Sequence, residues 1–345
     1  MDPNDWLEVI RREYLADFVA AGGAAIKVVV PADAAGRRDV QHRLRAIAEP
    51  LGYAFAAVDA ETTKIHLIDR LFFEVARQVD WDALARAYLA RSLAATGYRL
   101  PEATEAEELS DGALTITRLA AVNNLPEAAF LVDIKRALWN RLLGDHAMAR
   151  AFRLAMLRLC GAQLDPADEP TLTDAVKQWL RGELRLISAL KRTLIFQRIA
   201  RHNARQMLFS LAHWLALAGK SGLTLSLDVA RYADSSRPHE RGPGLYYSTP
   251  ACMDLYEVLR QLIDATDELE HCFVGVVAAP EFLTDDRRGL RSYHALYMRI
   301  ADEVRDRYRP NPRSSLVRLA AAVAPAMVRA EAAVAAVAES GGEGA

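Results

Sequence analysis

Residues 26–38 have the sequence IKVVVPADAAGRR. The apolar run at residues 26–30 predicts a buried strand, and the small residues after it predict a tight turn. Apolar residues then recur at Val40, Leu44 and Ile47, which is the spacing of a helix that buries one face. The sequence therefore predicts a strand, a short loop and a helix in succession.

The same succession carries the phosphate-binding sequence G-x-x-x-x-G-K-[S/T] in P-loop proteins. Here Pro31 takes the first glycine position and Gly36 the second, while Arg37 and Arg38 replace the lysine and the hydroxyl residue. Pro31 lacks a backbone N–H for phosphate, and Arg38 lacks the hydroxyl that holds Mg²⁺. Arg37 keeps a positive charge, but a guanidinium is not equivalent to an ammonium group. The stretch predicts a degenerate nucleotide site, in which ATP binding stays open and Mg²⁺ binding is disfavoured. An ordinary strand–turn–helix of another α/β protein is the alternative.

Composition limits the remaining possibilities. The 345 residues are enough for one large domain or two modest ones, and 52% hydrophobic and 26% charged residues are typical of a globular protein. A net charge of -2 argues against general binding to nucleic acid or membranes. No apolar run has the length of a membrane span, and the three cysteines lack C-x-x-C spacing, so we expect a cytoplasmic protein without disulfides or a zinc site.

The order of predicted elements indicates an α/β protein with a parallel sheet, and the degenerate loop indicates that this protein is P-loop NTPase-like. A helix at residues 5–20 precedes the first strand, and a second strand at residues 53–58 ends in Asp59, which completes a βαβ unit. We expect residues 1–62 and 207–310 to form this core and residues 63–206 to form a large helical insertion. Residues 311–345 are predicted to be a C-terminal helix, from Leu316 to about Val337, and a disordered tail.

The end of the insertion is predicted to be one long helix over residues 172–206, and it is locally basic. Arg198, Arg201 and Arg205 are candidates for DNA contact, because a basic helix face suits a phosphate backbone. A solvated helix face whose charges are paired by other helices is the alternative.

A third strand, residues 223–228, ends in Asp228, as in a Walker B strand whose aspartate holds Mg²⁺. Val229 follows, and a valine cannot act as the glutamate that orients water there. After a fourth strand at residues 272–278 come Arg287, Arg288 and Arg299, which we consider as sensor or finger arginines. The alternatives are a turn aspartate and arginines paired with carboxylates in a surface turn.

Three further blocks resemble a known family. These are LEVIRREYL at residues 7–15, LYYS at 245–248 running into DLYEVLR at 254–260, and PEFLTDDRRGL at 280–290. They are similar to sequences in the ATP-binding proteins of bacteriophage-exclusion (BREX) systems. The resemblance implies an AAA+-like P-loop ATPase fold, a prokaryotic cytoplasm, and work beside helicases and other DNA-handling proteins. Active members of that family have an intact loop and an Asp-Glu pair, from which this chain departs at Pro31, Arg37, Arg38 and Val229.

Three functional hypotheses follow. The first is an ATPase-like subunit of a defence or DNA-processing system that has lost hydrolysis and acts through partners, such as an active ATPase paralogue or a helicase. The second is a switch that binds ATP without cleaving it, and the third is a DNA-binding module that uses the basic insertion segment. The eight histidines show no metal spacing, so the sequence offers no other catalytic residues and no metal ligands. An oligomer is compatible with all three hypotheses, and we expect no membrane association.

Overall fold

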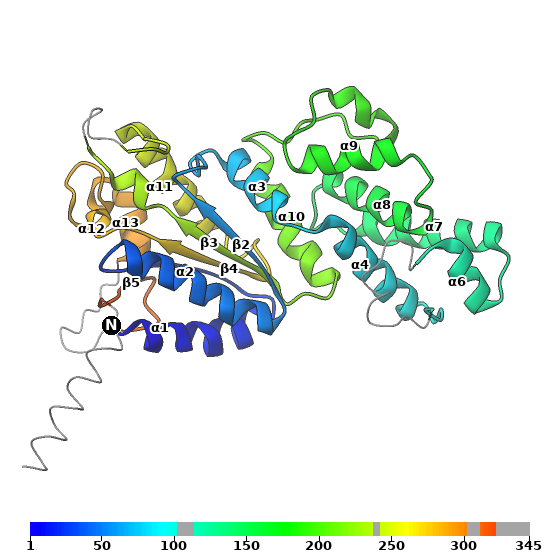
Figure 1. The fold of residues 1–345 in the computed structure, drawn as a ribbon, viewed down its shortest axis with the longest axis horizontal. Coiled ribbons are helices and arrows are strands. Elements are labelled where there is room, and N and C mark those ends of the chain that lie inside the picture. The colour runs from blue at the N-terminus through cyan, green and yellow to red at the C-terminus, as the bar shows by residue number, and fades with distance from the viewer. Residues whose placement is uncertain (102–113, 237–241, 302–310, 322–345) are drawn as a thin grey trace, which may run out of the picture.

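The computed structural model describes residues 1–101, 114–236, 242–301 and 311–321. Its centre is one five-stranded sheet with the order β2-β3-β4-β1-β5 (Figure 1). Every neighbouring pair of strands is parallel. The strands are β1 (Ala24–Val30), β2 (Tyr53–Asp59), β3 (Gly222–Asp228), β4 (Cys272–Val277) and β5 (Leu316–Arg318). The prediction of an α/β protein with a parallel sheet is confirmed at this level.

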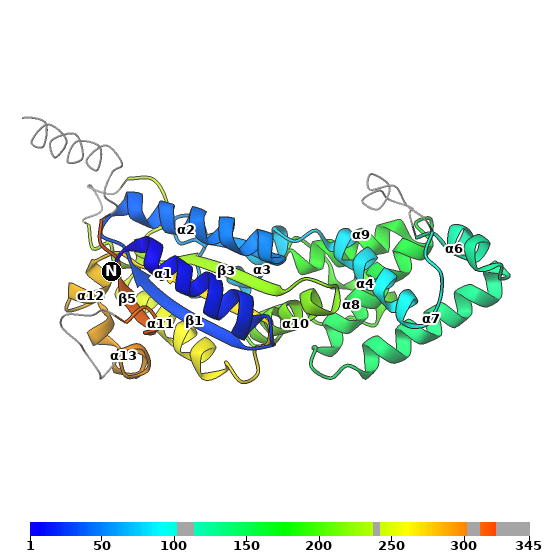
Figure 2. The same ribbon diagram turned by 90° about the horizontal axis from the view of Figure 1, so that it is seen from below.

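Helices cover both faces of the sheet (Figures 1 and 2). One face packs against α1 (Pro3–Val9), the π-helix η1 (Ile10–Val19) and α2 (Ala34–Ala48), around the fully buried Trp6, Leu44 and Phe273. The other face packs against α3 (Ile68–Arg77), α10 (Ala204–Leu217) and α11 (Thr249–Asp264). Because both faces are covered, the central strands β1, β3 and β4 are buried almost throughout, and the buried strand predicted at residues 26–30 is confirmed in β1.

A lobe of helices extends to one side of the sheet and lies in sequence between β2 and β3 (Figures 1 and 2). Asp80 caps one of these helices by accepting the backbone N–H of Ala83 at 3.0 Å. Buried side chains form one continuous cluster from β3 through Phe72 and Trp214 into the lobe at Phe152. The lobe therefore shares its hydrophobic core with the sheet. Its helices are α4 (Trp81–Ala95), α6 (Ile116–Asn123), α7 (Glu127–Gly144), α8 (Arg150–Leu164) and α9 (Pro170–Leu180).

The prediction of one long helix over residues 172–206 is wrong. The chain leaves α9 after Leu180, forms the short 3-10 helix η3 (Ile187–Thr193) and re-enters a helix only at α10. Gly182 has a φ of +74°, and a side chain there would meet the ring of Phe73 at 2.6 Å. The indole N–H of Trp179 also donates to the carbonyl of Gln197 at 3.0 Å, which folds the segment back across α9. These tertiary contacts override the helical spacing of the sequence.

The predicted C-terminal helix is also wrong at its start, because Leu316–Arg318 is the edge strand β5 beside β1. Leu319 donates its N–H to the carbonyl of Val30 at 3.0 Å. Val317 and Leu319 are buried while Arg318 is exposed, which is the alternation of a strand. The side of β1 that faces away from β4 has backbone N–H and C=O groups that need hydrogen-bond partners, and β5 supplies these partners. The rest of the predicted helix and tail, residues 322–345, lies outside the described residues.

Candidate functional site

A cavity of about 410 Å³ opens at the carboxyl ends of the parallel strands. Asp59 at the end of β2 lies in register with Asp228 at the end of β3, so the two carboxylates share this edge. Ligands of open α/β sheets bind in this position. The charged residues of the cavity wall are Arg37, Asp59, Glu61, Asp228, Arg231, Asp234 and Glu281.

The loop between β1 and α2 comprises only Pro31–Asp33, because the helix begins at Ala34. Gly36 therefore lies in the first turn of α2 rather than in a loop. Its N–H donates to the Asp33 side chain at 2.7 Å. Anions bind at helix N-termini through such N–H groups. Here the chain's own carboxylate takes one of the donors that a phosphate would use.

Arg37 and Asp228 are brought together as an ion pair. The Nε atom of Arg37 lies 3.7 Å from Oδ2 of Asp228, and the two side chains are only 21% and 16% exposed. The other Asp228 oxygen accepts the N–H of Ala230 at 2.9 Å. Arg38, by contrast, is exposed on α2 and does not line the cavity. Of the four predicted nucleotide-site residues, only Arg37 and Asp228 therefore face each other across this edge.

The cavity is acidic, with five carboxylates and two arginines on its wall. Burial raises the pKa of Asp228, and the neighbouring Asp59 and Glu61 raise it further, while the Ala230 N–H and Arg37 lower it. Such a wall repels a polyphosphate that comes without a cation. Among the described residues, no group of three or more His, Cys, Asp or Glu side chains could hold a metal ion. Arg38 stands where a P-loop has its hydroxyl and does not line the cavity, so the residues present do not supply the hydroxyl ligand that a P-loop gives to Mg²⁺.

An aromatic cluster that the sequence analysis missed lies in the two connections, after β2 and after β3, that also line the cavity. The rings of Tyr232 and Tyr247 stack at 3.8 Å with an angle of 15°, and His66 meets both edge-on. The Tyr232 hydroxyl accepts the backbone N–H of His66 at 2.9 Å, and the Tyr247 hydroxyl donates to the carbonyl of Thr63 at 3.0 Å. The cluster ties together the loops after β2 and β3. Its one signal in the sequence was the block at residues 245–248.

We expect the stability of the protein to fall on mild acidification because of His66. Burial lowers the pKa of His66 below its usual 6.5, so below pH 6.5 the unfolded chain takes up a proton before the folded one. The contribution of the neutral His66 side chain to the free energy of unfolding is complete above pH 6.5, and it declines as the pH falls toward the lowered pKa. Urea unfolding at pH 7.5 and pH 5.5 measures this loss, which should be smaller in His66→Gln than in the wild type. An equal loss in both proteins would contradict the assignment.

The arginines after β4 have different positions. Arg288 donates to the carbonyl of Asp234 at 2.6 Å and to that of Tyr232 at 3.3 Å, so it braces the segment after β3 that lines the cavity. Arg287 has an exposed side chain, and its backbone N–H donates to the side chain of Asp285 at 2.8 Å. Neither arginine lines the cavity.

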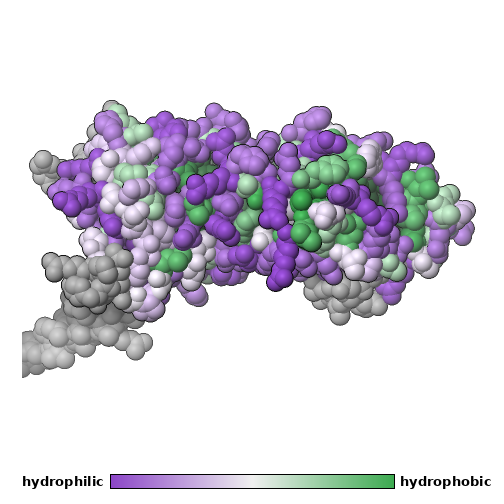
Figure 3. All heavy atoms as spheres, turned by 90° about the horizontal axis from the view of Figure 1, so that it is seen from above, coloured by the Kyte–Doolittle hydropathy of each residue, from purple (hydrophilic) through white to green (hydrophobic). Residues whose placement is uncertain are grey.

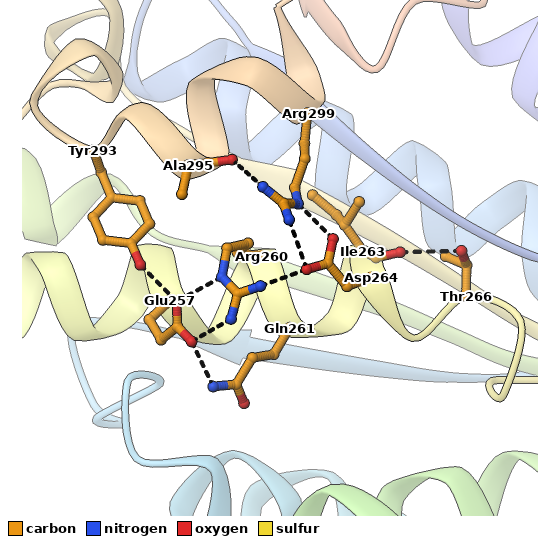
Figure 4. Close-up of polar contacts among 9 residues, drawn as sticks. All are labelled: Glu257, Arg260, Gln261, Ile263, Asp264, Thr266, Tyr293, Ala295 and Arg299. Atoms are coloured by element: carbon orange, nitrogen blue, oxygen red, sulfur yellow. Dashed lines mark hydrogen bonds and ion pairs between the residues drawn. The ribbon is translucent and has the colours of Figure 1, made fainter.

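Arg299 lies in α13 (His294–Ile300) and is tied to α11 (Figure 4). Its guanidinium holds both oxygens of Asp264, one at 2.9 Å, and donates to the carbonyl of Ala295 at 2.6 Å. It lines a separate cavity beside the first residues of β1, at the opposite edge of the sheet. The structure thus does not bring Arg299 together with Arg37 and Asp228.

The same network holds a second carboxylate, that of Glu257. Arg260 holds the carboxylate of Glu257 through two hydrogen bonds, and Tyr293 and Gln261 add one each (Figure 4). These contacts, chiefly that of Arg260, lower the pKa of Glu257 to about 2. The network therefore joins α11 to α13 as a structural element.

The basic residues of the insertion lie on another surface. Arg198, Arg201 and Arg205 are exposed, and none lines the cavity at the strand ends. Arg198 donates to the carbonyl of Arg185, which brings two stretches of the segment side by side. The guanidinium of Arg205 lies 6.0 Å from the ring of Phe209.

Residues 126–343 match the sequence model of a family described as "BREX system ATP-binding protein BrxC/D". The match covers more than half of the chain. The chain belongs to this family. Comparison with curated proteins and with solved structures found no match. The family assignment predicted from the three sequence blocks is thus confirmed.

The region that matches the BrxC/D family begins in the lobe and includes β3 with Asp228 and β4. It does not include β1, the loop at Pro31–Asp33 or Arg37. The family match therefore gives no information about the loop at Pro31–Asp33 or about Arg37. No helix within the described residues has the length and hydrophobicity to span a bilayer.

Proposed function

We propose that this BrxC/D family member is an ATPase-like subunit of a phage-defence system that has lost hydrolysis and acts by binding other proteins. One observation carries the proposal, the ion pair between Arg37 and Asp228. In a P-loop ATPase, Mg²⁺ stands between the loop hydroxyl and the Walker B aspartate. Here an internal guanidinium neutralises that aspartate, and the residue after it is the buried Val229.

The fold supports this proposal in one further respect. β4 lies between β1 and β3, so the strand with the Walker B-like aspartate is not the direct neighbour of the strand with the loop. The order β2-β3-β4-β1-β5 is typical of the additional-strand class of P-loop ATPases, which includes AAA+ proteins. A chain with this sheet and without the phosphate loop retains the shape of an ATPase for contact with its partners.

Incubation with Mg·ATP tests the proposal. We expect no phosphate release above the buffer blank, whereas active enzymes turn over at about 1 s⁻¹ or faster. The variant Arg37→Lys with Arg38→Thr should remain inactive, because the loop is still short and Asp33 still caps α2. Hydrolysis by the wild type that disappears in Asp228→Ala would overturn the proposal. Heat of ATP binding without turnover, in titration calorimetry, would favour the nucleotide switch instead.

DNA binding is a second candidate, because an exposed aromatic residue accompanies the arginines. Phe196 is 64% exposed and Leu186 is 70% exposed, and the contact of Arg198 with Arg185 brings their segments together. Arginines beside an exposed ring suit single-stranded nucleic acid, whose bases stack on aromatic side chains.

A fluorescent 20-nucleotide single strand tests this candidate in anisotropy titrations. If DNA binds here, Arg198→Glu with Arg201→Glu should weaken binding and reduce its salt dependence, and Phe196→Ala should weaken it by about 1–3 kcal/mol. Arg118→Glu, an exposed change on α6, is the control. No binding at low salt would remove the candidate.

A further inference from the structure

The lobe has an apolar groove that the proposed function does not use. It is a cavity of about 250 Å³ between α7, α8 and η3. Figure 3 shows hydrophobic residues gathered on the half of the molecule that these helices form. The apolar residues that line the groove are Leu138, Trp139, Leu154, Leu157, Leu172 and Leu194.

Large apolar side chains stand exposed at the groove. Trp139 and Leu194 are each 47% exposed, and they come from α7 and from the end of η3. Val132, seven residues before Trp139 on α7, is 53% exposed and extends the same helix face. Single exposed hydrophobic residues are ordinary, but a group of them around a cavity marks an interaction site.

Leu194 has a backbone conformation that is rare for a leucine. Its φ of +58° places a bulky residue in the left-handed region. Such a conformation costs about 1 kcal/mol or more and persists where the surrounding structure or a function requires it. It ends η3 and turns the leucine side chain into the wall of the groove.

The charge on the rim of the groove is positive. Its two carboxylates, Asp168 and Glu169, are neutralised by Arg158, which lies 3.1 Å from Asp168, and by Arg192, which pairs with Glu169. Lys135 is exposed on the rim, and no carboxylate of the described residues lies within ion-pair distance of it. The lining therefore carries three cationic and two anionic side chains.

We propose that this groove binds an amphipathic helix of a partner protein, with an apolar face and with Asp and Glu on its flanks. Helices bind to grooves through apolar side chains at spacings of i, i+3, i+4 and i+7. The leucine walls and Trp139 accept such side chains, and Lys135, the lining cation that pairs with no carboxylate of the described residues, meets an acidic flank. Walls made mostly of leucine do not suit DNA, whose bases stack on aromatic rings. The inference deepens the proposed function, because it states how the subunit recognises a partner.

Two synthetic peptides of 15 residues test the proposal with the full-length protein. Both have leucines at the helical spacing, and their flanks carry glutamate in one peptide and lysine in the other. In anisotropy titrations we expect the glutamate peptide to bind at least about 10-fold more tightly than the lysine peptide. Trp139→Asp and Lys135→Glu should each weaken that binding by about 10-fold or more, as changes at interface hot spots do.

Asn140→Asp and Arg136→Glu are the matched controls, because they add the same charges at neighbouring exposed positions of α7 outside the groove lining. The proposal is overturned if neither peptide binds, if both bind equally, or if Trp139→Asp has no effect. It is also overturned if Trp139→Asp dissociates a dimer in sedimentation, which would make a second copy the occupant, or if it abolishes binding of a single-stranded oligonucleotide. ATP turnover by the same sample would contradict the proposed function and leave peptide binding untouched.

Discussion

A Val317→Asp variant is expected to lose about 3–5 kcal/mol of unfolding free energy, because it buries an unpaired charge. Val317 is 4% exposed and packs with Trp6 and Phe273 beneath β1. The effect tests the replacement of a predicted helix by the edge strand β5. Urea unfolding monitored by circular dichroism measures it.

Arg318→Asp is the matched control for that experiment. Arg318 is the next residue on β5, and its side chain is exposed, so the same substitution should change stability by about 0.5 kcal/mol or less. Similar losses in the two variants would contradict the alternation of a strand. A loss in neither variant would contradict the pairing of β5 with β1.

An Arg37→Ala variant is expected to lose about 1–2 kcal/mol of unfolding free energy. Removal of the guanidinium leaves Asp228 with only the Ala230 N–H as a favourable partner, next to Asp59 and Glu61. Breaking a fully buried pair costs about 3–5 kcal/mol, and the partial exposure of this pair reduces that figure. Thermal and urea unfolding at neutral pH measure the loss.

Asp228→Asn, unlike Arg37→Ala, is expected to increase the free energy of unfolding at neutral pH. The pKa of Asp228 is raised, so the folded protein binds the proton more tightly than the unfolded chain does, and the carboxylate destabilises the fold as the pH rises above 3.8. The asparagine should therefore stabilise the protein at pH 7 relative to the wild type, and this gain should vanish below pH 3.8.

A double-mutant cycle completes this second prediction. In the Asp228→Asn background, Arg37→Ala should cost clearly less than in the wild type, because the charge that Arg37 neutralises is gone. Equal losses in the two backgrounds would show that Arg37 and Asp228 do not interact. The inference of an internal ion pair in place of a metal would then fail.

Much of the architecture was predictable because burial leaves a local pattern. The apolar runs of β1, β3 and β4 are buried on both faces, and such runs occur mainly in parallel sheets covered by helices. The prediction failed where a remote contact decided the outcome. Residues 172–206 have helical spacing throughout, but Gly182 against Phe73 and Trp179 against Gln197 interrupt the helix.

The candidate site was predictable only in part. Arg37 and Asp228 were found because each follows a strand, and the parallel sheet brings the carboxyl ends of its strands to one edge. Arg299 also follows a strand in sequence, but α13 turns it back to Asp264 at the other edge. His66, Tyr232 and Tyr247 have no common motif, because two separate connections, one after β2 and one after β3, bring their rings together.

The sequence by itself determined the strands that alternate with helices, the family, and the presence of Pro31, Arg37 and Arg38 where a P-loop has glycine, lysine and a hydroxyl. These are properties of single residues and of short-range spacing. Only the tertiary structure decided that β5 joins β1, that Asp33 occupies the N-terminus of α2, and that Arg37 neutralises Asp228. The physical reason is that these contacts depend on the distances between groups that the folded sheet and its loops bring together, and spacing along the chain does not encode those distances.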